Sequence, residues 1–201
     1  KKNVSKVLSG RWIGQGPMVD KFEKKFEEVI SKKHCAIATG SGTDSLHLAY
    51  ILAGLKEGDE VITTVFTCTA TNIPLLYMGI KIKFADIDIS TMNISVDSVK
   101  KLISKKTKAI VCVHYGGLPC DMTELQKLAN KYRIPIIEDA AHALGAKYNN
   151  KPIGCISDYT TFSFQAIKHF TTGDGGMLTI KNKNLLKKAK RVRWFGINRE
   201  N

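Results

Sequence analysis

The segment IPIIED, at residues 134–139, is a short apolar run that ends in two carboxylates. A run of this kind predicts a strand buried on both faces, as in a parallel sheet covered by helices. Such a strand delivers its last residue, Asp139, to the carboxyl end of the sheet, beyond which open α/β sheets bind ligands. We therefore expect Asp139 to belong to a binding site.

Segments of helical and strand character alternate on both sides of this run. The expected helices are residues 17–33, 43–55, 69–78, 96–103, 122–132 and 185–193, and the expected strands are residues 35–39, 60–65, 81–86, 109–114, 134–138, 159–164 and 176–180. This order predicts one α/β domain with a mostly parallel central sheet and helices on both faces, a three-layer sandwich.

A single lysine, Lys168, stands between an aromatic strand and a glycine-rich turn in SFQAIKHFTTGDGG, residues 163–176. Further upstream, GSGT at residues 40–43 joins another predicted strand to a helix. Alone, the lysine is typical of a solvated surface residue, and Asp139 is typical of a helix cap. Together they match pyridoxal phosphate, which needs a Schiff-base lysine, a carboxylate that keeps the pyridine nitrogen protonated, and backbone amides for its phosphate.

The composition is that of an ordinary soluble globular protein, with 43% apolar residues in 201. No apolar stretch approaches the roughly 20 residues that a membrane-spanning helix needs. The charged residues at the amino terminus are not followed by the apolar region of a signal peptide. We expect a cytoplasmic protein that does not interact with a membrane.

The net charge of +13 could indicate a nucleic-acid partner, but the lysines are spread along the chain and no known basic reader motif is present. The densest basic run, residues 181–193, is typical of an exposed helix face, so we expect no nucleic-acid partner. The five cysteines form no C-x-x-C pair and the five histidines show no paired helical spacing. Reduced thiols and no metal site are expected.

Three other site types fit poorly. The turn at residues 40–45 begins like a dinucleotide fingerprint, but Ser45 stands where the third glycine is needed. The glycine run at residues 173–176 lacks the Gly-Lys-Ser/Thr of a P-loop, which argues against nucleotide hydrolysis. No nucleophile-elbow sequence supports a serine or cysteine hydrolase.

With these residues laid out, the chain resembles the DegT/StrS family of sugar aminotransferases over nearly all of its length. The matching segments are GQGP at 14–17 followed by Phe22 and Glu23, SGT at 41–43, GDEVI at 58–62, EDAAH at 138–142, SF at 163–164 with Lys168, and TGDGG at 172–176.

The resemblance implies the fold-type-I large domain of homodimeric pyridoxal phosphate enzymes that move an amino group from glutamate to a nucleotide-linked keto sugar. It implies that Lys168 forms the internal aldimine and is catalytic, that Asp139 binds the pyridine nitrogen, and that His142 lies near the phenolic oxygen. The remaining residues that it assigns to cofactor binding are Gly42, Thr43, Asp44, Cys68 and Ser163.

Two departures from the family pattern stand out. Most members carry an aromatic residue that stacks on the cofactor ring where this chain has Cys68, and Phe66, two residues earlier, is a candidate substitute on the same strand face. Family members are also about twice this length. We therefore expect residues 1–201 to be an incomplete large domain that lacks the small carboxy-terminal domain and the residues that a partner subunit lends to the site.

The resemblance leaves two alternative functions open. Some relatives are nucleotide-sugar dehydratases in which histidine replaces the Schiff-base lysine, whereas this chain keeps Lys168 beside His169. A catalytically inactive regulatory relative is the other alternative, although the lysine, the aspartate and the phosphate turn are all retained.

Overall fold

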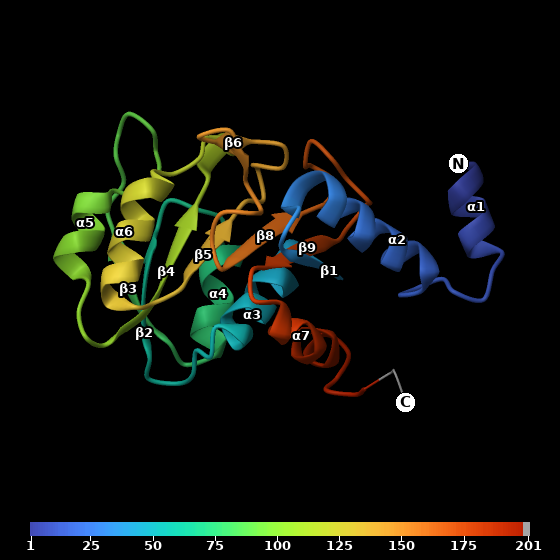
Figure 1. Ribbon diagram of the computed structural model, residues 1–201, viewed down its shortest axis with the longest axis horizontal. Helices are drawn as coiled ribbons and strands as arrows, with labels where there is room; N and C mark the ends of the chain where they lie inside the picture. Colours follow the sequence, from blue (N-terminus) through green and yellow to red (C-terminus); the bar gives the residue numbers. More distant parts are fainter. Residues whose placement is uncertain (199–201) are drawn as a thin grey trace.

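A seven-stranded sheet forms the centre of the computed structural model, which describes residues 1–198 (Figure 1). Across the sheet the strands run in the order β1 (Cys35–Thr39), β9 (Gly176–Ile180), β8 (Tyr159–Ser163), β5 (Ile136–Asp139), β4 (Thr107–Val113), β2 (Glu60–Thr64) and β3 (Lys81–Ala85). The five strands from β8 to β3 pair in parallel, and β9 runs antiparallel to both of its neighbours. The predicted mostly parallel sheet is confirmed.

Helices cover both faces of the sheet, as predicted. The helices are α1 (Lys2–Leu8), α2 (Pro17–Phe26), α3 (Gly42–Leu52), α4 (Thr69–Tyr77), α5 (Val96–Leu102), α6 (Met122–Tyr132) and α7 (Leu186–Arg193). One face packs on α3, α4 and α7 through buried residues such as Leu46, Leu75 and Ala189. The other face packs on α5 and α6 around Leu125, and on α2 around Phe26. Alternate residues of each strand pack into the cores on the two faces of the sheet, because successive side chains point to opposite faces.

Short elements complete the chain. They are the π-helical turn Glu27–Ser31, the 3-10 turns Tyr115–Gly117 and Lys183–Leu185, and the two-residue strands β6 (Lys147–Tyr148) and β7 (Lys151–Pro152). The expected helix at 17–33 therefore ends earlier and changes to π geometry, and Lys32, with φ 49°, closes it. The α1 helix was not predicted; it buries no residue, although Val4, Val7 and Leu8 follow helical spacing.

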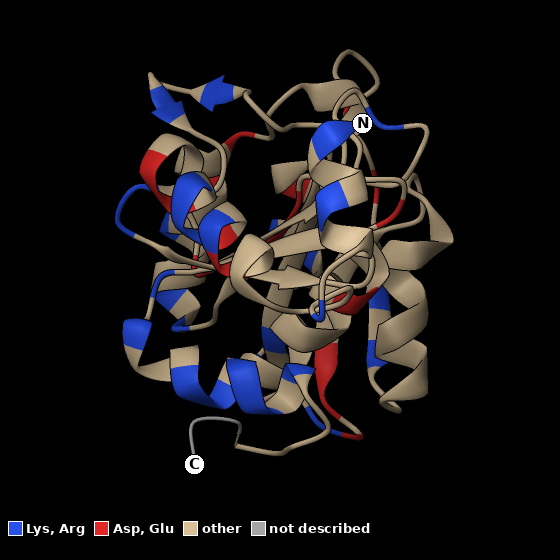
Figure 2. Cartoon of the chain, turned by 90° about the vertical axis from the view of Figure 1, so that its right-hand side faces the viewer, with Lys and Arg blue, Asp and Glu red and all other residues tan. Residues whose placement is uncertain are grey.

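The basic run before residue 193 forms an exposed helix face, as predicted. In α7 the side chains of Lys187, Lys188, Lys190 and Arg191 are exposed, while Ala189 is buried. Figure 2 shows this basic band along the edge of the molecule near the carboxyl terminus. No helix among residues 1–198 has both the length and the apolar character needed to cross a membrane.

Candidate active site

The start of α3 and the end of β8 meet in a close backbone approach. A Cβ atom at Gly42 would lie 2.8 Å from Cβ and 3.2 Å from Oγ of Ser163. Ser41 caps the helix, because its Oγ accepts a hydrogen bond from the Asp44 amide at 3.0 Å. Free amide groups at a helix N-terminus beside a serine hydroxyl form a suitable cradle for a phosphate.

Gly176, the first residue of β9, brings that strand against the start of α3 as well. It pairs with Thr39 of β1 and Ser163 of β8, and a Cβ atom there would overlap the Ser41 carbonyl oxygen. The two glycines, at 42 and 176, thus allow α3 to begin directly against β8 and β9. The glycine-rich turn recognised in the sequence therefore has a packing role as well as a conformational one.

Thr43 and Asp44, the other two residues expected to bind the cofactor at the start of α3, differ in their burial. Thr43 is half-buried in the first turn of α3. Asp44 is exposed, and its Oδ2 lies 2.8 Å from the position that a Cβ atom on Gly40 would take. The helix dipole stabilises an acidic side chain in the first turn, and the Asp44 amide belongs to the capped turn. A role for Asp44 in cofactor binding stays a prediction.

Asp139 lies at the carboxyl end of β5, 5% exposed, as the apolar run predicted. Its Oδ2 accepts a hydrogen bond from the Thr71 hydroxyl at 2.6 Å, and its Oδ1 accepts one from the Ala141 amide at 3.1 Å. A carboxylate bonded in this way is held in one orientation at the sheet edge. It can accept a charge-assisted hydrogen bond from a ring N–H.

Lys168 is half-buried in the loop between β8 and β9. The base of this loop is fixed by a hydrogen bond from the Thr171 hydroxyl to the Phe164 carbonyl at 2.8 Å. Next to the lysine, Nε2 of His169 donates to the Leu144 carbonyl at 3.0 Å, which ties this loop to the segment after β5. The loop is therefore anchored on both sides of Lys168.

His142, on the segment after β5, faces the same region. Partial burial and then the positive charges of Lys168 and His169 lower its pKa, while Asp139 acts in the opposite direction. The imidazole therefore favours the neutral form, which can donate or accept a hydrogen bond. Lys168 and Asp139 both influence the pKa of His142, so the three residues lie in one region of the structure.

Cys68 is exposed and occupies the position just before α4, one turn ahead of Thr71. The strand β2 ends at Thr64, so the expectation that Phe66 and Cys68 share a strand face was wrong. The ring of Phe66 instead packs on Tyr115, with 4.5 Å between the ring centroids. Phe66 thus packs against a neighbouring ring, and the correspondence of Cys68 to the family's stacking aromatic stays a prediction.

A buried polar cluster beneath the site was not predicted. Nδ1 of His114 accepts from the Cys120 amide at 3.1 Å, so Nε2 carries the proton and donates to Glu138 at 2.7 Å. Burial alone would raise the pKa of Glu138, but hydrogen bonds from His114 and Thr160 outweigh it and lower that pKa. The cluster stiffens β5 immediately before Asp139, and its signal in the sequence was limited to a carboxylate within an apolar run.

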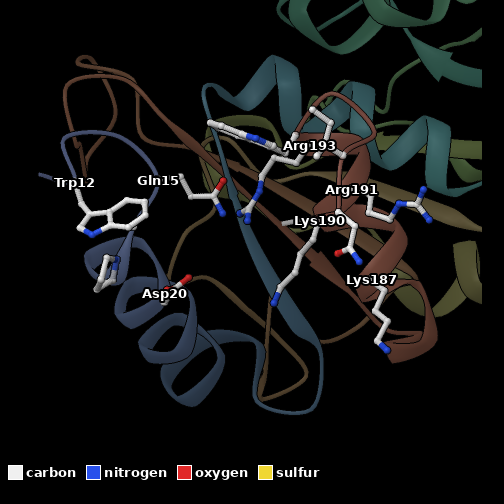
Figure 3. Close-up of a pocket in the computed structure, with 12 residues that line it drawn as sticks. Trp12, Gln15, Asp20, Lys187, Lys190, Arg191 and Arg193 are labelled. Carbon is white, nitrogen blue, oxygen red and sulfur yellow. The ribbon is translucent and has the colours of Figure 1, made fainter. Parts of the chain in front are cut away.

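A cavity of about 500 Å³ lies between the N-terminal segment and α7. Figure 3 shows basic side chains of α7 on one side and Trp12, Gln15 and Asp20 on the other. None of the residues expected to bind the cofactor lines this cavity. Among residues 1–198, no group of three or more His, Cys, Asp or Glu side chains is placed to hold a metal ion.

Comparison with known proteins agrees with this geometry. The model of the DegT/DnrJ/EryC1/StrS aminotransferase family matches residues 1–201. The chain belongs to this family. It is 46% identical over 197 residues to the uncharacterized protein MJ1066 of Methanocaldococcus jannaschii, covering 98% of this chain and 51% of that protein. It is 40% identical over 200 residues to GDP-perosamine synthase of Escherichia coli O157:H7, covering 98% of this chain and 54% of that protein.

A solved structure gives the same result for the fold. The PLP form of the putative sugar aminotransferase Spr1654 from Streptococcus pneumoniae superposes with a TM-score of 0.90 at 30% identity, covering 95% of this chain and 54% of that one. The fold is therefore that of the fold-type-I aminotransferases. The chain spans about half the length of the relatives that it matches.

Exchange of Gly42 for alanine tests the helix-start cradle. The new Cβ atom would lie 2.8 Å from Ser163 Cβ, so α3 or β8 must shift, at a cost of about 1 to 3 kcal/mol. We expect pyridoxal phosphate to bind roughly ten-fold or more weakly, measured by fluorescence titration of the full-length protein. Gly14→Ala is the matched control, since no heavy atom lies within 4 Å of its Cβ position. Equal affinities of the two variants would argue against a phosphate at this corner.

Exchange of Cys68 for phenylalanine tests whether the thiol occupies the ring-stacking position. Because the side chain is exposed, a larger one can be accommodated there. A stacked ring pair contributes about 0.5 to 1.5 kcal/mol beyond its buried area, which predicts cofactor binding tighter by roughly two- to ten-fold. Cofactor titration of Cys68→Phe and Cys68→Tyr measures this, and loss of binding with an intact fold would show that another group covers the ring.

Proposed function

We propose that this chain is the cofactor-binding large domain of a pyridoxal phosphate-dependent aminotransferase that moves an amino group from glutamate to a nucleotide-linked keto sugar. The observation that carries the proposal is the convergence of Lys168, a buried and oriented Asp139 and the glycine-lined start of α3 at one end of the sheet. The proposal includes a homodimer in the cytoplasm, with a site completed by the partner subunit.

The residues present fit this cofactor. The space above Gly42, which a Cβ atom would fill, and the capped first turn of α3 suit the phosphate, with the Ser163 hydroxyl beside it. Asp139 suits the protonated ring nitrogen, and His142 suits the phenolic oxygen. When bound, pyridoxal phosphate supplies an electron sink that stabilises negative charge on the carbon next to the amino group.

The chain's own groups supply anchoring and proton movement. Lys168 Nζ can bind the cofactor covalently and later carry a proton, because an amine is both a nucleophile and a base. The oriented carboxylate of Asp139 at the sheet edge would accept a hydrogen bond from the ring nitrogen and favour its protonated form. The anchored loop between β8 and β9 limits how far Nζ can move, which keeps it within reach of the reacting carbon.

The substrates follow from the family rather than from a pocket in the chain. One relative at 40% identity is a GDP-perosamine synthase, and its name indicates an amino sugar carried on a nucleotide. A nucleotide-linked keto sugar is therefore the proposed acceptor for this chain, and glutamate is proposed as the donor from the family resemblance.

The test begins with the full-length protein and pyridoxal phosphate. We expect a visible absorbance band and, after borohydride reduction, a modified peptide that contains Lys168. The loaded protein is then given glutamate and a panel of nucleotide-linked keto sugars, with 2-oxoglutarate release as the readout. Binding followed by loss of water from the sugar would favour the dehydratase alternative, and a folded protein without cofactor binding would contradict the proposal.

A further inference from the structure

A line of hydroxyl groups runs from the start of α4 to Asp139. The Oγ1 atoms of Thr67 and Thr71 are 2.7 Å apart, and Thr71 Oγ1 is 2.6 Å from Asp139 Oδ2. Thr71 is fully buried and Asp139 nearly so. Thr71 of α4 and Asp139 of β5 are 68 positions apart in the sequence, so this is a tertiary contact rather than a local turn.

The direction of the hydrogen bonds in this line is determined. An ionised carboxylate can only accept, so the single hydroxyl proton of Thr71 points to Asp139. Thr71 must then accept from Thr67, whose hydroxyl is the donor of the pair. A donor that itself accepts a hydrogen bond is polarised, and bonds in such a chain strengthen one another.

The backbone at Thr71 is held in place as well. The hydroxyl of Tyr50, a fully buried residue of α3, donates to the Thr71 carbonyl at 2.7 Å. Burial, and to a lesser extent the charge of Asp139, raises the pKa of Tyr50 well above its ordinary value, so this donor keeps its proton. Both the main chain and the side chain of Thr71 are thereby fixed against the aspartate.

The two oxygens of Asp139 have different kinds of partner. Oδ1 accepts from a backbone amide, that of Ala141, whereas Oδ2 accepts from a side chain. Within residues 1–198, Thr71 provides the side-chain hydrogen bond that the structure gives to this carboxylate. Substitution at position 71 can therefore change the electrostatics of Asp139 while the backbone contact remains.

We propose that Thr71 is a positioning residue that, through its hydrogen bond to Asp139 Oδ2, holds the carboxylate ionised and aimed at the ring nitrogen of the cofactor. This inference rests on the proposed function. A hydrogen bond to an ionised group contributes more than a neutral one, and its loss leaves the carboxylate with a higher proton affinity. The ring nitrogen would then share its proton more with Asp139 and carry less positive charge.

The charge on the ring is visible in a titration. A less positive ring withdraws less electron density from the nitrogen that joins Lys168 to the cofactor, so that nitrogen keeps its proton to higher pH. In Thr71→Val we expect the pH midpoint of the visible band to rise by about half a unit or more. We expect the dissociation constant of pyridoxal phosphate to rise roughly ten-fold or more.

Three further variants separate positioning from simple support of the fold. Thr71→Ser keeps the hydroxyl and should restore both the midpoint and the affinity. Thr160→Val removes an equivalent buried hydroxyl that donates to Glu138 at 2.8 Å, so it should destabilise the protein without moving the midpoint. Thr67→Val removes only the upstream donor, and a smaller shift in the same direction is expected. It provides the test if Thr71→Val does not fold.

The outcomes distinguish this inference from the proposed function. If the wild-type full-length protein binds no pyridoxal phosphate, both fail. If the wild type binds it and neither Thr71→Val nor Thr67→Val moves the midpoint, the function stands and the role of Thr71 is overturned. An equal shift in Thr160→Val would also overturn it, because the effect would then reflect general loosening of the sheet.

Discussion

Replacement of Lys168 by alanine in the full-length protein is expected to abolish covalent cofactor attachment and to lower turnover by roughly four or more powers of ten. The lysine is both the covalent anchor and the proton carrier in the proposed function, and acid–base catalysis alone contributes about 10²- to 10⁴-fold. Steady-state kinetics and mass spectrometry after borohydride reduction measure the two effects separately.

Lys168→Arg is the matched control for this prediction. It keeps the positive charge beside His142 but cannot serve as a nucleophile at neutral pH, because arginine remains protonated. We expect it to be as inactive as Lys168→Ala while preserving the phosphate cradle at α3. Retained turnover in either variant would show that another residue carries the chemistry.

The site residues at the ends of strands could be predicted from the sequence, because the order of strands and helices along the chain places them at one edge of the sheet. Asp139 follows an apolar run, Gly42 follows a predicted strand, and the carboxyl ends of parallel strands share one edge of the sheet. The role of Lys168 required more, since a lysine in a loop is ordinary by itself. Together with the glycine-rich turn and Asp139, Lys168 indicated a pyridoxal phosphate site. The family resemblance then implied that Lys168 is the Schiff-base lysine.

Contacts between distant elements could not be predicted in the same way. The Thr71 to Asp139 hydrogen bond depends on the strand order β5-β4-β2, in which β4 lies beside β2 although β3 comes between them in the chain. The His114 and Glu138 pair likewise arises from the register of two adjacent strands. Binary apolar patterns identify buried strands but not their order, so partners across the sheet require the structure.

One missed local element did have a signal in the sequence. The small hairpin formed by β6 and β7 turns at Asn149 and Asn150, which adopt φ angles of 47° and 61°. Asparagine tolerates this left-handed region, and two such residues in succession are typical of a tight hairpin turn. The strands themselves are only two residues long, which is too short for a visible alternation of apolar and polar residues.

Replacement of Asp139 by asparagine is expected to leave the cofactor bound but to lower turnover by about two to four powers of ten. The side chain keeps its shape but loses the charge that holds a proton on the ring nitrogen, at a cost of about 3 to 5 kcal/mol in transition-state stabilisation. The amide also disturbs the hydroxyl line, because an amide nitrogen at the Oδ2 position would face the Thr71 hydroxyl donor-to-donor.

Asp158→Asn is the control for the loss of a carboxylate elsewhere in the same sheet. Its Oδ2 accepts from the Ile136 amide at 3.1 Å, at the opposite end of β5 from Asp139, so it should affect stability rather than turnover. Steady-state kinetics, together with the visible spectrum of the loaded protein at several pH values, measures the difference. Near-normal turnover in Asp139→Asn would mean that another acid protonates the ring.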